Sequence, residues 1–446
     1  MATTHHARFV EGYTLRHIIK MAAASTLGLL MLFSSDLVDM YFLSQLGNPL
    51  LVSAVGFAGT LVFFTTAVGI GLQVAMGALV SRSIGAGHGR QASMQCSSVL
   101  LYSFLFGVLM FVPMLIFLSP LLTLLGAGQD TLALAMSYSH ILLPATPFMA
   151  VGMGAAAALR SLGDAKRSMY VTMISALVNI VLDVVFIFGF GWGLEGAAWA
   201  TFLSRVVLML LAVYWIIGIH RLPVWITPQY FLASLKGITA IAGPAMLTSL
   251  ATPLASSYVI KTMATYGDEA VAGSALVGRI VPVTFAAIFA ISGAVGPILG
   301  QNAGANRYDR VRHAIIEAVW VNIVYCLFAW LVLYLLRYTL VDAFSATGIT
   351  ADLIVFYCQY LVGGFLFSGM LFIANASFNN LGQAYMATIF NFSRTLLGIV
   401  PFVYFFSQWY GPRGVLTGEV VGVSVFGVLA LYMALRRVAY LQRHAD

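Results

Sequence analysis

The sequence predicts an all-α polytopic membrane protein whose twelve transmembrane helices form two six-helix lobes related by an internal repeat. Three observations lead to this fold class. The 446-residue chain is 61% hydrophobic and only 8% charged, and its mean hydropathy of +0.95 would leave a soluble protein of this size with a large apolar surface. Apolar runs of about 20 residues recur along the whole chain. Short motifs also return at one constant spacing.

The apolar runs are the predicted membrane spans. Each can cross roughly 30 Å of hydrocarbon as a helix, and each is too unbroken for the alternating strands of a membrane barrel. The first run is too long for the core of a signal peptide, so we expect it to remain as the first helix. The predicted spans are residues 21–43, 53–79, 94–118, 134–157, 168–190, 194–218, 238–264, 270–298, 314–336, 351–375, 386–407 and 414–435.

The distribution of Lys and Arg predicts that both termini lie in the cytoplasm. Sixteen of the 22 basic residues fall in the two tails and in the even-numbered turns, whereas the opposite loops hold only Arg337 and Arg413. Basic residues collect in cytoplasmic loops, so we expect a multi-pass protein of the cell inner membrane. The same pattern accounts for the net charge of +7, and no nucleic-acid partner is expected.

The three cysteines, Cys96, Cys326 and Cys358, lie inside apolar segments at spacings that match no zinc or redox motif. We therefore read them as small core residues and expect no bound cofactor.

The internal repeat has an offset of 219 residues. The loop "SRSIGAGHGR" matches "GQNAGANRYDR", with Gly85 opposite Gly304, and "SLGDA" matches "NLGQA", with Gly163 opposite Gly382. The repeat predicts an N-terminal lobe at residues 1–220 and a C-terminal lobe at 221–446, with parallel topology because six helices return the chain to the same side. Transporters are often built from such repeats, although an old duplication kept only for stability is the alternative.

Two predicted spans of the N-terminal lobe contain aspartates that have no acidic counterpart in the other lobe. The stretch "SSDLVDMYFLSQLG" places Asp36 and Asp39 near the end of the first span, and the fifth span contains Asp183. At the repeat offset, Asp39 and Asp183 fall opposite Tyr258 and Phe402. Since a requirement of the fold would recur in both lobes, these acids point to a function of one lobe.

Depth predicts that four polar residues meet. Asp39 lies eight residues before Gly47, Asp183 lies eight before Gly191, and Thr201 lies eight after Gly193. Each is therefore roughly 12 Å from the outer boundary. Asn179 lies one turn from Asp183 on the same helical face. We expect a single pocket of Asp39, Asn179, Asp183 and Thr201.

This group of residues suits a coupling cation. A charged Asp near the middle of a span costs about 2.5 to 3.5 kcal/mol, so two such acids need a compensating partner. A close pair would take up a proton as a unit, and carboxylate, amide and hydroxyl oxygens also suit Na⁺. The alternative is structural: Asp183 would hydrogen-bond a neighbouring helix, and Asp39 would reach the outer surface.

The chain resembles the multidrug and toxic compound extrusion (MATE) family, and most closely its DinF-like prokaryotic branch. The resemblance covers essentially the whole chain and is carried by "DMYFLSQLG", "GALVSRSIGAG", "NIVLDVVFIFGFGWGLEGAAWAT" and "GPILGQNAGANR". It implies a V-shaped fold of two lobes. It also implies a secondary multidrug antiporter that exports amphipathic, mostly cationic compounds in exchange for H⁺ or Na⁺ by alternating access.

The resemblance also implies roles for particular residues. In the family, an acid on helix 1 and the Asn, Asp and Thr of helices 5 and 6 are associated with the coupling cation, which gives Asp39, Asn179, Asp183 and Thr201 here. Asp36 matches no family position; it is a candidate relay or entry residue, or it simply faces the cavity. One departure is Ser25, which stands where family members usually have a proline on helix 1. A proline-driven bend is therefore in doubt.

The C-terminal lobe has basic residues within or near its spans. Arg279 lies about nine residues into the eighth span and is the candidate for a substrate or gating contact. For Lys261 and Arg394 we favour snorkelling or structural pairing, with Glu317 and Glu419 as the available acids. The basic residues also suggest an alternative function, a flippase for lipid-linked oligosaccharides or other lipids of the same superfamily.

An enzymatic function is not expected. A membrane-embedded aspartyl protease would also need two intramembrane acids, but its Gly-x-Gly-Asp signature is missing. The nearest match, "SLGD", lies in a predicted cytoplasmic loop beside Lys166 and Arg167. The expected partners are the lipid bilayer and small drug-like molecules, with the protein acting as a monomer.

Overall fold

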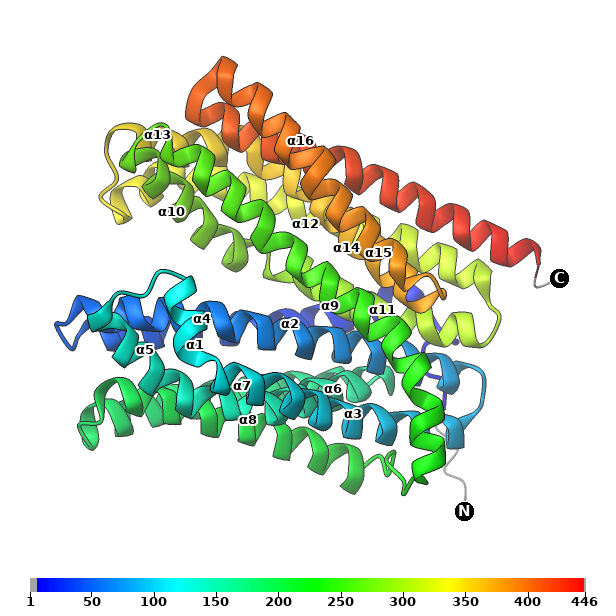
Figure 1. Cartoon of the computed structure of the whole chain (residues 1–446). Helices are drawn as coiled ribbons and strands as arrows, with labels where there is room; N and C mark the ends of the chain where they lie inside the picture. Colours follow the sequence, from blue (N-terminus) through cyan, green and yellow to red (C-terminus); the bar gives the residue numbers. More distant parts are fainter. Residues whose placement is uncertain (1–5, 445–446) are drawn as a thin grey trace. The chain divides into compact units, whose positions relative to one another are not determined.

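The computed structural model describes residues 6–444, and the regular secondary structure of these residues is helical throughout (Figure 1). Contacts divide the chain into two units. Unit 1 consists of Met1–Arg8 and Leu27–Met246, and unit 2 consists of Phe9–Thr26 and Leu247–Asp446.

The contact division differs from the predicted lobe boundary at 220/221, which follows from the repeat. The boundary between the two contact units falls inside helix α9 (Pro228–Ala264), because the first half of that helix packs on unit 1. A Cβ atom at Gly71 would come within 2.7 Å of the carbonyl oxygen of Ala242, so the two backbones are in close contact. Helix α1 (Thr14–Ser44) is divided in the same way, after Thr26.

The helices of the N-terminal half follow the predicted spans. Helix α6 is central in this half and packs against α2, α3 and α8. The elements are α1 (Thr14–Ser44), α2 (Pro49–Gly85), α3 (Gly89–Ile116), α4 (Leu118–Leu124), α5 (Gln129–Leu142), η1 (Leu143–Ala145), α6 (Thr146–Ser161), α7 (Ala165–Asp183), η2 (Val184–Gly189) and α8 (Gly193–Gly218).

The C-terminal half repeats this arrangement. Its central helix is α14, which packs against α11, α12 and α16. The elements are α9 (Pro228–Ala264), α10 (Asp268–Thr284), α11 (Ala286–Gly304), α12 (Tyr308–Ala343), α13 (Gly348–Phe356), η3 (Tyr357–Leu361), η4 (Val362–Gly364), α14 (Phe365–Asn380), α15 (Ala384–Ser393), η5 (Arg394–Ile399) and α16 (Val400–Arg443).

The helical segments account for the twelve predicted spans. Eleven segments of the described residues are long and apolar enough to cross a membrane, and the last, Ala384–Arg443, is 60 residues long. That segment contains two spans, because Gly411 has φ 58° and ψ −136° and interrupts the helix. A left-handed φ of this kind is open to glycine with little strain.

The predicted span 270–298 is interrupted where it contains a proline. Pro282 has no N–H for the helical ladder, and α10 ends two residues later at Thr284. The Tyr325 hydroxyl donates a 2.7 Å hydrogen bond to the carbonyl of Thr284 at this helix end. The Thr284 carbonyl at the break is thus hydrogen-bonded within unit 2, and the span continues as helix α11.

The internal repeat of the sequence is also present in the secondary structure. Helix α6 and its counterpart α14 have the same length and are separated by the predicted offset of 219 residues, and so are the 3₁₀ turns η1 and η4 that precede them. The paired glycines Gly163 and Gly382 have nearly equal left-handed φ values, 78° and 77°. The repeat is therefore structural as well as a similarity of motifs.

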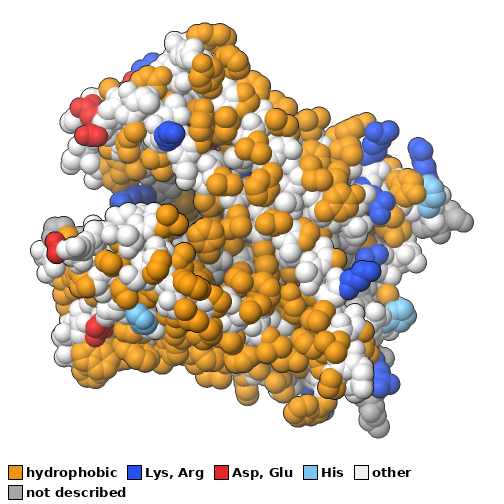
Figure 2. Space-filling model, viewed as in Figure 1, with side chains coloured by type: hydrophobic (Ala, Val, Ile, Leu, Met, Phe, Trp, Pro, Cys, Tyr) orange, Lys and Arg blue, Asp and Glu red, His pale blue; other side chains and the backbone are white. Residues whose placement is uncertain are grey.

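The surface of each unit matches a membrane environment. Hydrophobic side chains cover most of the surface along the helices, and the charged side chains lie mainly near the helix ends (Figure 2). Since the lipid-facing surface is apolar, the polar groups within the bundle are expected to have a function or to be paired with one another.

Asp164, in the turn between α6 and α7, fixes the start of α7. Its carboxylate accepts a hydrogen bond from the backbone N–H of Arg167 at 3.2 Å and from His220 Nε2 at 2.9 Å, and it also pairs with the Arg167 guanidinium. Burial alone would raise the pKa of Asp164, but the hydrogen bonds from His220 and Arg167 hold that pKa well below its ordinary value of 3.8.

We expect Asp164→Asn to lower the free energy of unfolding by about 1 to 2 kcal/mol, since a helix cap and an ion pair are weakened. The lowered pKa means that the carboxylate contributes fully above pH 3.8 and that its contribution is lost as the pH falls below that value. Thermal unfolding of both proteins in detergent, followed between about pH 3 and pH 7, measures this. A stability difference that does not shrink at the acidic end contradicts the assignment.

Candidate functional site

The ends of α1, η2 and α8 are held at one level in unit 1. Leu43, Ile187 and Leu194 are buried in one hydrophobic cluster, and the rings of Phe42 and Phe188 pack edge to face with centroids 5.6 Å apart. This packing fixes the level of Asp39, Asp183 and Thr201, which lie one or two turns away along these helices.

Asn179 lies at the centre of the polar residues. Its amide, oriented from the hydrogen-bond network, donates from the nitrogen to both carboxylate oxygens of Asp39 at 3.2 and 3.3 Å and to Ser35 Oγ at 2.6 Å. With the amide turned over, the Ser35 hydroxyl donates to the amide oxygen and the nitrogen lies 3.5 Å from Thr201 Oγ1. In both orientations Asn179 links α7 to α1, and in the second it also contacts α8 through Thr201.

Asp183 is completely buried one turn from Asn179. Neither of its carboxyl oxygens accepts a hydrogen bond from an N–H or O–H group of the described residues. Its partner is the carboxyl group of Asp39, which lies within hydrogen-bonding reach. Two carboxylates have no proton to share, so this contact requires one protonated acid or a cation between the two.

A π-helical segment begins directly after Asp183. Residues Val184–Gly189 form wider turns than an α-helix does, and such turns are frequent at functional sites. Gly196 of α8 lies against this segment, where a Cβ atom would come within 2.9 Å of the Phe186 carbonyl oxygen. The absence of a side chain at Gly196 therefore lets α8 and its Thr201 approach Asp183.

The structure thus brings Asp39, Asn179, Asp183 and Thr201 together on three helices of unit 1. Their oxygens form a donor set that fits Na⁺, while the carboxyl pair fits a proton equally well. Within residues 6–444 there is no group of three or more His, Cys, Asp or Glu side chains placed to hold a metal ion.

Three further residues of this cluster were not predicted from the sequence. Ser35 lies four residues before Asp39, and Arg205 lies four residues after Thr201, so helical spacing was an available signal for both. Tyr138 of α5 is buried with its hydroxyl near Thr201. The sequence could have indicated Tyr138 through the repeat, because Tyr357 stands at the equivalent position of the C-terminal half.

Asp36 lies on the exposed side of α1, one turn from Asp39. It is close enough to interact electrostatically with both Asp39 and Arg205. Arg205 of α8 is partly buried, and its Nη1 atom is fully buried without a hydrogen-bond partner among the described residues. Asp36 is therefore part of the same charged cluster, where it faces the acid Asp39 and also the arginine Arg205.

The basic candidates of unit 2 lie on different helices. The side chains of Lys261 on α9 and Arg279 on α10 are exposed. Arg394, only 6% exposed, has its Nη2 atom 3.4 Å from Thr252 Oγ1, and its charge interacts with that of Glu419 on α16. This arrangement supports the pairing alternative for Arg394, whereas the gating role of Arg279 stays a prediction.

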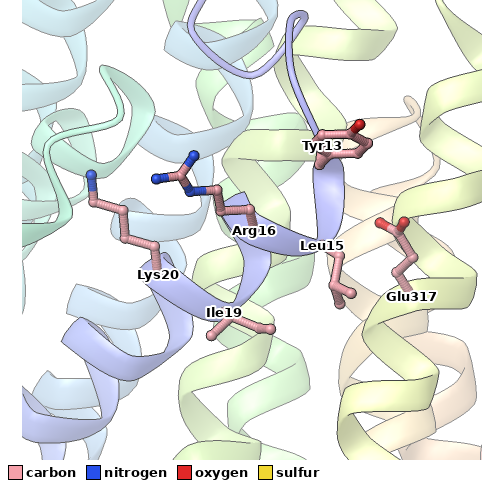
Figure 3. A pocket seen from close by; sticks show the side chains of 6 residues that line it. All are labelled: Tyr13, Leu15, Arg16, Ile19, Lys20 and Glu317. Carbon is pink, nitrogen blue, oxygen red and sulfur yellow. The ribbon is translucent and has the colours of Figure 1, made fainter.

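A cavity of about 590 Å³ lies in unit 2 between the first turns of α1 and helix α12 (Figure 3). Glu317 lines it and accepts a hydrogen bond from Thr14 of α1, so this acid has a hydroxyl partner. The remaining lining residues include Arg16 and Lys20. The predicted coupling residues lie outside the lining of this cavity.

The chain is similar to known transporters over nearly its whole length. It is 26% identical over 428 residues to a protein of Shewanella oneidensis MR-1 named an FAD transporter, with 94% of each chain covered. It is 25% identical over 414 residues to the multidrug export protein MepA of Staphylococcus aureus N315, covering 91% of this chain and 90% of that one.

Solved structures agree with these relatives. A crystal structure of a mutant of the Vibrio cholerae MATE transporter VcmN superimposes with a TM-score of 0.90, at 25% identity, over 96% of this chain and 97% of that one. The MatE family profile matches residues 24–185 and 244–404. The matched segments contain Asp36, Asp39, Asn179 and Asp183 and cover most of both halves, and the chain accordingly belongs to the MATE family of transporters.

Proposed function

We propose that this protein is a secondary active multidrug antiporter of the inner membrane. It exports amphipathic, mostly cationic compounds in exchange for H⁺ or Na⁺, and both of its termini face the cytoplasm. The observation that carries the proposal is the contact between the half-buried Asp39 and the fully buried Asp183, two acids of which at least one must be protonated or neutralised by a cation.

The contacts of Asp39 suggest how binding of the cation is linked to movement. As a carboxylate, Asp39 accepts hydrogen bonds from Asn179 at 3.2 and 3.3 Å. A proton or Na⁺ at Asp39 and Asp183 weakens the attraction of that carboxylate for the amide, so α1 is freed to pack differently against α7. A cation can shift the equilibrium between two conformations only through such a difference in interactions.

The imposed cation gradient supplies the energy for export. For a neutral substrate, one positive charge that moves inward through 100 mV provides about 2.3 kcal/mol, which corresponds to about fiftyfold in concentration ratio. A monovalent cationic substrate exchanged one for one moves no net charge, so its export is driven by the concentration gradient of H⁺ or Na⁺ alone. The substrate leaves outward as the conformation alternates, and the protein acts as a monomer without a bound cofactor.

The two similar proteins suggest two different classes of substrate. The similar Staphylococcus protein is named for multidrug export, whereas the similar Shewanella protein is named for FAD, an anionic dinucleotide. The acidic residues of unit 1 favour a cationic compound. FAD is the second candidate because of that relative's name.

Reconstituted proteoliposomes test the proposal. We expect a preloaded cationic dye to be transported when an inward gradient of H⁺ or of Na⁺ is imposed, and not when both gradients are absent. Empty liposomes and proteoliposomes preloaded with FAD in place of the dye are run in parallel. Transport that ignores both gradients overturns the antiport mechanism, and gradient-driven export of FAD without transport of any cationic dye favours the dinucleotide as substrate.

A further inference from the structure

Asp36 and Arg205 are held at the same level on the two sides of α7. Ser35, the residue before Asp36, donates to the Ala176 carbonyl of α7 at 3.5 Å and contacts Asn179 at 2.6 Å. On the other side, the carbonyl of Ser204, the residue before Arg205, accepts a 2.7 Å hydrogen bond from Ser175 of α7. The backbones that carry the two charges are therefore both anchored within one turn of α7.

The inner level holds charges of both signs, unlike the outer level. Asp36 interacts electrostatically with Asp39 and, in the opposite sense, with Arg205, whereas Asp39 and Asp183 at the outer level contact an amide and each other. The Nη1 atom of Arg205 is buried, and no described residue offers it a hydrogen bond. A buried guanidinium nitrogen without a hydrogen bond is retained at a cost, so a favourable charge nearby is needed to offset it.

We propose that Arg205 is a positioning residue that serves as the resident counter-cation of Asp36, so that the coupling cation is confined to Asp39 and Asp183. The inference rests on the proposed antiport function and deepens it. Without Arg205, Asp36 would be an unpaired, exposed carboxylate one turn from Asp39, and it would attract the same cation. With Arg205 in place, an exposed acid is prevented from competing with the buried pair.

The inference predicts shifts of opposite sign from two single variants. Arg205→Gln removes a positive charge near the acids, so we expect the cation concentration for half-maximal dye efflux to fall about tenfold. Asp36→Asn leaves Arg205 uncompensated beside Asp39, so this concentration should rise about tenfold. The double variant removes both charges, so its half-maximal cation concentration should be close to that of the wild type. Arg205→Lys keeps the positive charge and should retain the wild-type concentration.

The probes are Na⁺ at fixed pH and H⁺ at fixed Na⁺, in proteoliposomes that contain the full-length protein. A purely structural pairing would lower the maximal rate of both single variants and leave the half-maximal concentration unchanged, and this result overturns the inference. Shifts in the same direction also overturn it.

A third variant separates failure of this inference from failure of the proposed function. If Asp39→Asn still couples dye efflux to the gradient, the antiport proposal itself fails. If Asp39→Asn uncouples transport while the Asp36 and Arg205 variants do not shift in opposite directions, only the role of Arg205 is lost.

Discussion

Replacement of Asp39 by asparagine is expected to reduce gradient-driven efflux by at least about a hundredfold. The substitution keeps the shape of the side chain but removes the group that would carry the coupling charge, and it leaves the buried Asp183 facing a neutral amide. Asp183→Asn should have an effect of similar size, because the two carboxyl groups act as one unit. Efflux is measured in proteoliposomes under each imposed gradient.

Asp130→Asn is the matched control for these variants. Asp130 is an exposed acid in the first turn of α5 in the same unit, so its substitution should leave transport unchanged. Each variant should also bind substrate in the absence of a gradient, which separates loss of coupling from loss of the fold. Wild-type coupling in both Asp39→Asn and Asp183→Asn would show that the buried pair is structural.

The second large effect is expected at Gly418, where two backbones of unit 2 meet. Gly414, Gly418 and Gly422 recur every fourth residue and face the preceding helical segment. Spacing of this kind lets membrane helices approach closely. A Cβ atom at Gly418 would lie 2.6 Å from the carbonyl oxygen of Phe402 and from the backbone of Val403, so the backbone itself would have to move.

Gly418→Ala should therefore destabilise the protein by about 3 kcal/mol, at the upper end of the cost of overpacking. Thermal unfolding in detergent and the yield of monodisperse protein measure this loss. Gly293→Ala in α11 is the control, because an added Cβ atom there would meet no neighbouring atom of the described residues within 4 Å and alanine favours a helix. Equal stability of the two variants would mean that the close contact at Gly418 is relieved without cost.

Much of the fold could be predicted because it follows from hydropathy and repetition. The length of apolar runs predicts spans, and the offset of 219 residues predicts the two similar halves that α6 and α14 display. Pro282 and Gly411 mark two places where the helices depart from simple spans. The division of contacts inside α1 and α9 was not predictable, because a span's own pattern does not identify the helices that will pack along each half.

The candidate site could be predicted in part for a related reason. Counting residues from the helix ends gives the depth of Asp39, Asp183 and Thr201, since a helix rises a fixed distance of about 1.5 Å per residue. Depth does not give the rotation of each helix about its axis. Rotation decides that Asn179 reaches Asp39 and that Tyr138 joins from α5.

Hydropathy, charge and repetition along the chain were enough to establish that it spans a membrane, that it contains two similar halves, and that Asp39 and Asp183 have no acidic counterpart at the repeat offset in the other half. The identity of the groups that meet came from the folded molecule. Folding places the carboxyl of Asp183 against that of Asp39 and gives Asp36 the counter-charge of Arg205. The difference arises because the hydropathy of a segment determines only whether it spans the membrane and how deep each residue lies. The partners of a buried charge depend on how the side chains of neighbouring helices pack against one another.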